Sequence, residues 1–493
     1  MKEYKIYVNG KFVTTQTVLE VTNPYSNKVF AKTYLAGQDE LENAISGAES
    51  VKEEMQNLPT YRRYEILRQI SDTIIKMREG LAHVLAEESG KPIRYALGEI
   101  DRASQTFLVA AEESKRLPGG YISIDWTAKG EGKEGWIKYF PVGMIAGISP
   151  FNFPLNLAVH KIAPAIASGN TIILKPARST PLSVLELAKI IDKTSLPKGA
   201  LSILPMDRKA GNQLVTDERF KLLSFTGSPA VGWKMKQDAG KKKVLLELGG
   251  NAGVIISESA DLDLAVEKCL VGSFAYSGQV CIHVQRIYVQ NSVFDEFKTK
   301  FIKKVKELKA GDPLDPETEI SVMIDEENAI RVDEWVKEAV GSGAEMLCGG
   351  AKKESFFEPT VLTGTQPEMK VCSLEIFGPV ITLEKFNRFS EAIYAVNNSK
   401  YGLQAGVFTN ALNEMDMAFN EIEAGGVILN DVPTFRVDHM PYGGVKNSGL
   451  GREGVKYAIF EMMEPRLLIK GKHPAPSTQH PAPSTQHPAP SNQ

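Results

Sequence analysis

The chain has 493 residues, more than a single hydrophobic core usually supports, and two or three domains are expected. Apolar residues make up 43% of it, charged residues 24%, and the formal net charge is −3, which fits a globular protein and gives no sign of a nucleic-acid partner. No apolar run approaches the roughly 18 residues of a membrane span, and MKEYKIYVNGKF lacks a signal-peptide core, so we expect a cytoplasmic protein with no membrane partner.

The pattern along the chain predicts helices first and two α/β regions after them. Residues 38–115 are expected to be helical, because LRQISDTIIKMREGLAHVLAEESG combines heptad-like apolar spacing with strong helix formers. From Trp136, helical stretches separate the β-rich runs IKYFPVGMIAGISP, NTIILKPA, LSILP, LLSFTGS and GVIIS. A second alternation runs from IYVQNSVFDEFKTKFIKKVKEL through PTVLTG, PVITLEKF and GVFTN to GVILN. Two α/β domains with parallel sheets are therefore predicted.

Two further segments are expected to form a small β arm. GGYISIDWTAKGEGKEGWIKYF is interpreted as a hairpin, and PRLLIKGK as an edge strand that pairs with it. Exposed sheet edges favour association, so we expect a homodimer or homotetramer. The HPAPSTQ-repeat tail at 473–493 is rich in Pro, Ser and Gln and cannot build a core. Its histidines stand seven residues apart and would chelate poorly, so no metal site is expected.

Cys281, in YSGQVCI, is either a small core residue or a nucleophile. The four cysteines lack the spacing of a zinc site or a disulfide framework, which suits a reducing compartment. A nucleophilic cysteine needs an activated thiol, a place for the oxyanion and a group that activates water. His283 lies two positions further on, so a Cys–His hydrolase dyad remains open.

Three other blocks place a polar residue in an apolar, turn-forming setting. They are SPFNFP, LELGG and EIFGPV, and they make Asn152, Glu247 and Glu375 candidates for a site, because buried polar groups need partners. Together with YSGQVCI, LKPARSTP, FTGSPAVG and PYGGVKNSGLGREG, these blocks resemble those of the NAD(P)-dependent aldehyde dehydrogenases. The resemblance spans roughly residues 5–472 and extends to lactaldehyde and non-phosphorylating glyceraldehyde-3-phosphate dehydrogenases.

This resemblance implies an α/β, aldehyde dehydrogenase-like fold with two Rossmann-like α/β domains and a small β oligomerisation arm. The implied cofactor-binding domain covers 1–118 and 142–249, the catalytic domain 250–447, and the arm 119–141 and 461–472. Cys281 would attack the aldehyde, and the Asn152 side-chain amide and the Cys281 backbone N–H would hold the oxyanion. Glu247 would deprotonate the water that hydrolyses the thioester.

The implied cofactor is NADP or NAD. GSPAVG, at Gly227–Gly232 after the apolar run KLLSFT, departs from the common GxGxxG spacing but resembles the variant of this family, with Ser228 and a helix N-terminus facing the pyrophosphate. Lys175 would bond the adenosine ribose, and Glu375 and Phe377 would hold the nicotinamide ribose and ring. The implied cofactor set is Ile148, Ser149, Pro150, Phe151, Lys175, Arg178, Gly211, Gly227, Ser228, Val231, Leu248, Glu375 and Phe377.

Three details qualify the cofactor prediction. GLGREG at 449–454 matches GxGxxG, but we expect its upstream context, PYGGVKNS, to be a loop without a strand, so we interpret it as a turn into a helix. Arg178 stands where NAD-preferring relatives commonly carry a glutamate, which favours NADP. Leu374 replaces the glutamate that often precedes the residue matched by Glu375, and we expect no loss of the nicotinamide contact.

Alignment with the family would bring three polar residues to the mouth of the aldehyde tunnel. Arg102, in GEIDRASQTF, would lie on a helix facing the tunnel, and Arg436, in NDVPTFRVDHMP, in the loop that closes it. His160 follows Asn152 by about two helical turns. Such a positive mouth could bind a carboxylate or phosphate. The alternative is that the arginines form surface ion pairs, for instance Arg436 with Asp438.

We therefore expect a short, polar, anionic aldehyde, such as glyceraldehyde 3-phosphate or a semialdehyde. Neutral lactaldehyde is the alternative, because GQVCIHVQRIYV also resembles lactaldehyde dehydrogenases. Acyl-transferring relatives generally lack a glutamate at the LELGG position, and Glu247 argues against that activity. A cysteine hydrolase would leave LKPARSTP and FTGSPAVG unexplained, and a non-catalytic binding protein would be expected to have lost Cys281, Asn152 or Glu247.

Overall fold

A computed structural model describes residues 1–471 in two compact units. One unit contains Met1–Leu117 and Pro141–Glu464, and the other contains Pro118–Phe140 and the chain from Pro465. The predicted repeat tail at 473–493 lies outside the described residues. In residues 1–471, no helix has both the length and the apolar content that a membrane span requires.

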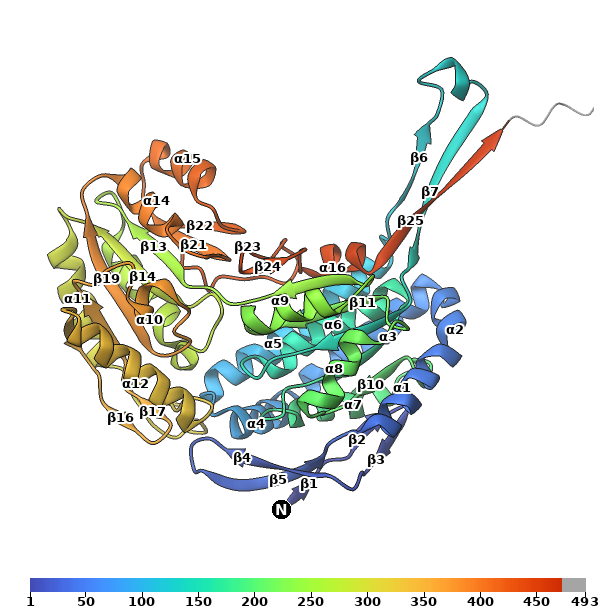
Figure 1. Cartoon of the computed structure of the whole chain (residues 1–493), viewed down its shortest axis with the longest axis horizontal. Helices are drawn as coiled ribbons and strands as arrows, with labels where there is room; N and C mark the ends of the chain where they lie inside the picture. The colour runs from blue at the N-terminus through green and yellow to red at the C-terminus, as the bar shows by residue number, and fades with distance from the viewer. Residues whose placement is uncertain (472–493) are drawn as a thin grey trace, which may run out of the picture. The chain divides into compact units, whose positions relative to one another are not determined.

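The first unit begins with short strands that the sequence analysis did not predict, followed by the expected helices (Figure 1). Strands β1 (Lys2–Glu3), β5 (Lys28–Tyr34) and β4 (Val18–Asn23) form a small sheet. The helices predicted for 38–115 are confirmed as α1 (Gln38–Ser50), α2 (Lys52–Asn57), α3 (Thr60–Lys76), α4 (Arg78–Ser89) and α5 (Ile93–Ser114).

An eight-stranded sheet in the order β24-β12-β11-β8-β9-β10-β2-β3 follows. Its five central strands are parallel, as predicted, whereas its edge strands pair antiparallel. The parallel strands are β8 (Met144–Ile148), β9 (Thr171–Lys175), β10 (Leu201–Ile203), β11 (Leu222–Thr226) and β12 (Lys243–Glu247). The antiparallel ones are β2 (Ile6–Val8), β3 (Lys11–Val13) and β24 (Gly449–Leu450), and the connecting helices are α6 (Pro154–Ser168), α7 (Leu182–Asp192), α8 (Arg208–Thr216) and α9 (Pro229–Asp238).

Helix α6 lies at the centre of this unit. Pro154 occupies its first turn, where a missing N–H costs nothing, and Gly169 ends it in the left-handed conformation with φ 83°. Its sequence is apolar around most of the helix, and every residue from Pro154 to Ser168 is buried. It packs against α5 and α3. The N-terminus of α6 therefore has a fixed position directly after Asn152.

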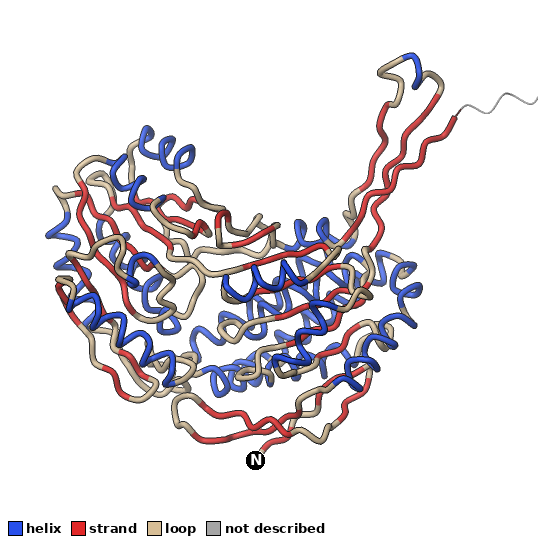
Figure 2. The backbone as a smooth tube through the Cα atoms, viewed as in Figure 1, coloured by secondary structure: helices blue, strands red, loops and turns tan. Residues whose placement is uncertain are grey.

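The second predicted α/β region forms a seven-stranded sheet in the order β15-β18-β19-β14-β13-β21-β22, drawn as red strands in Figure 2. All neighbours are parallel except β15 and β18. The strands are β13 (Ala252–Ile256), β14 (Val284–Gln290), β15 (Glu345–Cys348), β18 (Thr360–Thr363), β19 (Val380–Phe386), β21 (Gln404–Phe408) and β22 (Gly426–Leu429). The helices are α10 (Leu262–Phe274), α11 (Phe294–Lys306), α12 (Glu326–Gly341), α13 (Lys370–Ser373), α14 (Phe389–Asn397) and α15 (Leu412–Glu421). The last helix, α16 (Val455–Glu461), packs against α5 and α6 of the first region.

The segment around GLGREG differs from the prediction. PYGGVKNS contains the two-residue strand β23 (Val445–Lys446), which pairs with β20 (Tyr401–Gly402), so the expectation of a loop without a strand was wrong. Gly449 and Leu450 then pair with Glu247 and Leu246 of β12. The expected turn into a helix is present, because α16 begins at Val455. This hairpin-like segment forms the edge of the first sheet beside Glu247.

The second unit is a three-stranded sheet. Strand β6 (Gly119–Ser123) pairs antiparallel with β7 (Lys133–Pro141), and β25 (Met463–Gly471) lies on the other side of β7. The predicted hairpin and its pairing with PRLLIKGK are thus confirmed. Apolar side chains remain exposed on this sheet: Tyr121, Trp136, Leu467, Leu468 and Ile469.

Candidate active site

Cys281 lies in the loop between the short 3-10 helix η2 (Ala275–Gly278) and β14. Tyr276 and Ser277 have φ values of 50° and 52°, and Gly278 has φ 67°. A Cβ on Gly278 would lie 2.1 Å from the carbonyl oxygen of Gly378, so only glycine fits this close approach. The sequence YSG therefore forms a tight turn whose backbone conformation is held by its surroundings, and this turn fixes the loop that carries Cys281.

Cys281 is partly buried. Val280, Ile282, Leu403 and Tyr442 form a small apolar cluster against which Cys281 packs. Burial raises the pKa of the Cys281 thiol to about 11, whereas a hydrogen bond with Tyr442 acts in the opposite direction. The Tyr442 hydroxyl lies 3.4 Å from Sγ. The resting cysteine is therefore a neutral thiol that must lose its proton before it can attack.

Asn152 is held beside this loop by bonds at both ends of the residue. Its side-chain Nδ2 donates to the carbonyl oxygen of Gln279 at 3.0 Å, and its own carbonyl accepts from Lys91 Nζ at 2.7 Å. An amide nitrogen carries two hydrogens, so one remains after the bond to Gln279. This free donor suits the stabilisation of an oxyanion.

A fully buried ion pair between Lys91 and Glu99 holds the backbone on both sides of the start of α6, including that of Asn152. Glu99 Oε1 accepts from the backbone N–H groups of Leu155 (3.0 Å) and Asn156 (3.1 Å), which caps the N-terminus of α6. Lys91 Nζ also lies 3.9 Å from the centre of the Phe153 ring. The pair thus fixes the first turn of α6 and the residue before it.

Glu247 stands at the carboxyl end of β12 and is buried. Its Oε2 has no hydrogen-bond partner within residues 1–471. Burial, followed by the negative charge of Glu453, raises the pKa of Glu247 well above its usual value. A carboxyl group with a raised pKa and a free oxygen suits proton transfer at neutral pH.

One cavity of about 350 Å³ brings these three residues together with much of the predicted cofactor set. Besides Cys281, Asn152 and Glu247, the predicted residues that line it are Pro150, Phe151, Gly227, Ser228, Leu248, Glu375 and Phe377. Glu375 accepts from the Gly250 N–H at 2.9 Å, and burial raises its pKa to about 7. The Phe151 and Phe377 rings meet edge to face at 5.9 Å.

A larger cavity, of about 890 Å³, contains most of the other predicted cofactor residues: Ile148, Lys175, Arg178, Gly211 and Val231. Arg208, Lys209 and Lys234 add positive charge to its lining, and Asp238 is the acidic residue among the lining side chains. Ser149 lines neither cavity; it is buried, and its Oγ has no partner in the described chain. This cationic cavity suits a phosphate-bearing ligand.

The local structure around both cavities fits a dinucleotide. As predicted, β11 leads directly into Gly227 and Ser228, and α9 begins at Pro229. The side chain of Ser228, the N-cap of α9, makes no capping bond, and a helix N-terminus attracts phosphate. A Cβ on Gly211 would lie 2.8 Å from Cε of Lys175, so this glycine makes room for the lysine that is predicted to reach the ribose.

The three predicted substrate residues lie together in a hydrogen-bonded network, and none of them is among the residues that line the two cavities. Asp438 Oδ1 accepts from Arg102 and lies equally close to His160 Nε2, both at 2.9 Å. Arg436 bonds Glu453 at 3.0 Å and lies 3.3 Å from His160 Nδ1. The suggested surface pair of Arg436 with Asp438 is wrong, because Arg436 is buried and pairs with Glu453, whereas Asp438 pairs with Arg102.

The Cys–His alternative finds no support in this geometry. His283 lies in the loop before β14, not in a strand, and it is buried. Burial lowers its pKa to about 3, so the imidazole is neutral, and its Nε2 has no partner among the described residues. Tyr442, rather than His283, is the residue that bonds Cys281.

Sequence reasoning did not single out several residues that build the site. Tyr442 and Glu453 stand within the block PYGGVKNSGLGREG, which was used only as a family marker. Lys91 and Glu99 gave no signal, because a lysine and a glutamate in a helical region are usually exposed. The other residues missed are Lys161, which bonds Thr226 and pairs with Glu453, and the cavity-lining Asn328, Arg331 and Trp335.

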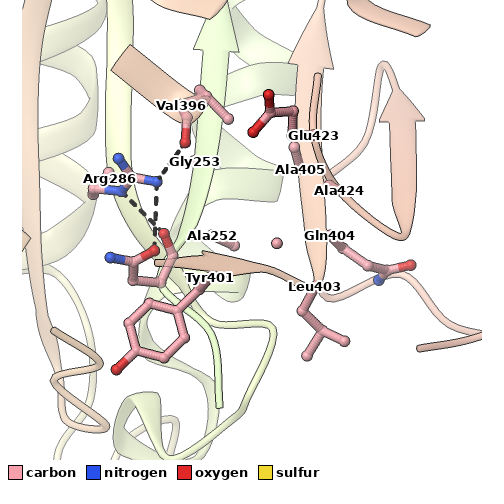
Figure 3. Close-up of a pocket in the computed structure, with 12 residues that line it drawn as sticks. Ala252, Gly253, Arg286, Val396, Tyr401, Leu403, Gln404, Ala405, Glu423 and Ala424 are labelled. Carbon is pink, nitrogen blue, oxygen red and sulfur yellow. Dashed lines mark hydrogen bonds between the residues drawn. The ribbon is translucent and has the colours of Figure 1, made fainter. Parts of the chain in front are cut away.

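A third, very small cavity of about 20 Å³ lies beside β13 and β21 (Figure 3). Arg286 of β14 lines it and donates to the carbonyl oxygens of Asn251 (3.0 Å) and Val396 (3.1 Å). Because these backbone acceptors already satisfy the guanidinium, we interpret Arg286 as a structural residue that joins β14 to neighbouring loops.

Comparison with known proteins agrees with the resemblance. The chain matches the aldehyde dehydrogenase family over residues 12–468. It is 43% identical over 471 residues to a 3-sulfolactaldehyde dehydrogenase of Priestia aryabhattai, covering 95% of this chain and 98% of that one. It is 41% identical to a lactaldehyde dehydrogenase of Methanococcus aeolicus, covering 94% and 99% of the two chains.

Solved structures are similar over the same range. Aldehyde dehydrogenase 21 of Physcomitrella patens, in complex with the reaction product succinate, superposes with a TM-score of 0.94 at 46% identity and covers 95% of this chain and 98% of its own. The glyceraldehyde-3-phosphate dehydrogenase GapN of Methanocaldococcus jannaschii, complexed with NADP, gives a TM-score of 0.88 at 40% identity and covers 92% and 99%. The chain therefore belongs to the aldehyde dehydrogenase family and is an NAD(P)-dependent oxidoreductase that acts on aldehydes.

Proposed function

We propose that the protein oxidises a short, polar, anionic aldehyde to its carboxylate through a thiohemiacetal and a thioester on Cys281. The observation that carries this proposal is the shared cavity, in which Cys281, Asn152 and Glu247 lie with Glu375 and Phe377. A nucleophile, an oxyanion donor and a base thus line the same space as residues that suit a nicotinamide.

In the first half of the reaction, the thiolate of Cys281 adds to the carbonyl carbon of the aldehyde. The S–C bond forms, and the electron pair of the C=O bond moves to oxygen. The free Asn152 Nδ2 hydrogen and the Cys281 backbone N–H stabilise that charge, which develops only in the transition state and intermediate. Glu375 and Phe377 would hold the nicotinamide, which would supply the acceptor for the hydride that leaves the adduct as the thioester forms.

In the second half, Glu247 takes a proton from the water that attacks the thioester. Its raised pKa makes it a stronger base than an exposed carboxylate, and its free Oε2 can accept the proton. Hydrolysis breaks the S–C bond, releases the carboxylic acid and returns the thiolate. The presence of Glu247 also favours hydrolysis over transfer of the acyl group to another acceptor.

Unused hydrogen-bond donors support an anionic substrate. The Nε atoms of Arg102 and Arg436 are buried and have no partner within residues 1–471. The relatives named for 3-sulfolactaldehyde and glyceraldehyde 3-phosphate act on anionic aldehydes, and succinate is the product bound to the plant relative. Lactaldehyde is the second candidate, favoured by the lactaldehyde dehydrogenase relatives and by the pairing of both arginines with carboxylates.

For the cofactor we propose NADP in preference to NAD. Arg178 lines the larger cavity together with Lys175, Arg208 and Lys209, so a 2′-phosphate would meet several cations, and Asp238 is the one carboxylate among the described residues of this lining. The GapN relative was solved with NADP. We further propose a cytoplasmic homo-oligomer in which the first sheet binds cofactor, the second completes the catalytic domain, and the three-stranded unit is the association arm.

The test of the substrate is a matched pair of aldehydes that differ by one sulfonate, 3-sulfolactaldehyde and lactaldehyde, each assayed with NADP and NAD. The parent is expected to favour the sulfonate by at least about tenfold in kcat/KM, equal to about 1.4 kcal/mol. Arg102→Ala should remove most of this preference, whereas Arg388→Ala, an exposed arginine, should leave it unchanged. A parent that prefers lactaldehyde or hexanal would contradict the anionic substrate.

A further inference from the structure

Tyr442 is buried and held in one position by the backbone. Its N–H donates to the Glu453 carbonyl at 3.0 Å, and the Glu453 N–H donates back at 2.6 Å. This reciprocal bridge joins the loop before β23 to the turn that precedes α16. The two bonds therefore fix the backbone from which the Tyr442 ring extends.

The Tyr442 hydroxyl contacts the reacting atom itself, 3.4 Å from Cys281 Sγ. While the cysteine carries its proton, either atom can donate. Once the sulfur is a thiolate it has no hydrogen, so only the phenolic O–H can donate, and the bond becomes charge-assisted. A hydrogen bond of this kind stabilises the ionised state of the cysteine more than its neutral state.

Arg436 contacts the face of the Tyr442 ring. The guanidinium lies 3.6 Å from the centre of the Tyr442 ring and is bonded to Glu453 at 3.0 Å. A cation over the face of an aromatic ring stabilises the stacked arrangement. Tyr442 thus contacts Arg436 through the face of its ring and Cys281 through its hydroxyl group.

We propose that Tyr442 is a further catalytic residue, whose hydroxyl donates a hydrogen bond to the sulfur of Cys281 and stabilises the attacking thiolate. The proposal rests on the role of Cys281 given above. Burial in the apolar cluster opposes ionisation of the thiol, so a local donor is needed there. Arg436 also favours the thiolate, whereas the carboxylates of Glu375 and Glu247 oppose it.

The test is the rate of alkylation of Cys281 by iodoacetamide in the full-length protein without cofactor, between about pH 7 and about pH 10. Peptide mass spectrometry separates Cys281 from Cys269, Cys348 and Cys372. Tyr442→Phe keeps the ring and removes only the hydroxyl. It is expected to lower the rate about tenfold across this range, which corresponds to a shift of about one pH unit in the ionisation of the thiol.

Tyr7→Phe is the matched control, because it removes a hydroxyl that bonds Asp192 at 2.9 Å in a different part of the fold. Its Cys281 alkylation profile should equal that of the parent. If Tyr442→Phe does not fold, 3-fluorotyrosine in place of Tyr442 keeps the size and hydroxyl but makes the phenol a stronger donor. Alkylation should then become faster.

An alkylation profile unchanged in folded Tyr442→Phe, or unchanged with 3-fluorotyrosine, would overturn the role of Tyr442. This result would leave the proposed function intact, because the assay measures ionisation of the cysteine and not turnover. Conversely, undiminished aldehyde oxidation by Cys281→Ala would refute the proposed function even if the alkylation profiles behaved as expected.

Discussion

At the scale of single residues, burial determines how the catalytic groups can act. Cys281 is partly buried and Glu247 is buried, and burial raises the pKa of each. A raised pKa weakens the thiol as a nucleophile but improves the carboxylate as a base. The sulfur therefore needs a local hydrogen-bond donor, and the Tyr442 hydroxyl lies 3.4 Å from it.

The proposed preference for NADP depends on one side chain. Arg178→Glu replaces a cation in the larger cavity by a carboxylate that repels a 2′-phosphate and can accept from ribose hydroxyls. We expect the ratio of kcat/KM for NADP to that for NAD to fall by at least about tenfold. Arg388→Glu, at an exposed position, is the control. If Arg178→Glu left the ratio of kcat/KM for NADP to that for NAD unchanged, Arg178 would not contribute to the distinction between the two cofactors.

At the scale of elements, the contacts that hold the start of α6 stabilise the fold and also position Asn152. Lys91 and Glu99 are both fully buried and bond the backbone on either side of this helix start. Lys91→Ala leaves the Glu99 charge unpaired in the interior, which is expected to lower the free energy of unfolding by about 3–5 kcal/mol. Denaturant unfolding measures this change.

A double-mutant cycle separates the free energy of the Lys91–Glu99 pairing from the cost of leaving one of the two buried charges without its partner. Lys91→Met combined with Glu99→Leu should lose less stability than the sum of the single variants, because neither charge remains unpaired. Arg62→Ala, which breaks an exposed ion pair with Glu65, should leave the free energy of unfolding unchanged. Strict additivity of the Lys91 and Glu99 variants would contradict a coupled pair.

Local patterns predicted the elements better than they predicted the contacts. The apolar run before GSPAVG specified β11 and the start of α9, because strand, turn and helix signals follow one another directly. The alternative that paired Arg436 with Asp438 was wrong, because it relied on nearness in sequence, whereas the Tyr442–Glu453 bridge brings the more distant Glu453 to Arg436. The short strands at β23 and β24 were missed because two-residue strands have no periodicity to detect.

At the scale of the whole molecule, the three-stranded unit presents apolar side chains that a monomer would leave in water. Leu467 and Ile469 are 48% and 50% exposed and lie two residues apart on β25, so they share one face. Strand β25 is also an edge of its sheet, and exposed edges with apolar side chains favour association. This arrangement supports the proposed homo-oligomer.

Charged residues on this face should weaken association. Leu467→Glu combined with Ile469→Glu is expected to lower the molar mass in solution, measured by light scattering after size-exclusion chromatography. Tyr61→Glu places the same charge at an exposed apolar position of α3 and should leave the mass unchanged. A parent that is monomeric, or a double variant with the mass of the parent oligomer, would refute the arm as the interface.

Aldehyde oxidation through a thioester on Cys281 is the central step of the proposed function. Glu247→Gln tests this step most directly. This variant retains the nucleophile and removes the base for hydrolysis, so mixing it with NADP and 3-sulfolactaldehyde should give a rapid burst of about one reduced cofactor per active site, followed by slow turnover. Peptide mass spectrometry of the quenched reaction should find the acyl group on Cys281. The absence of both the burst and the Cys281 adduct, in a variant that folds as the parent does, would contradict the account.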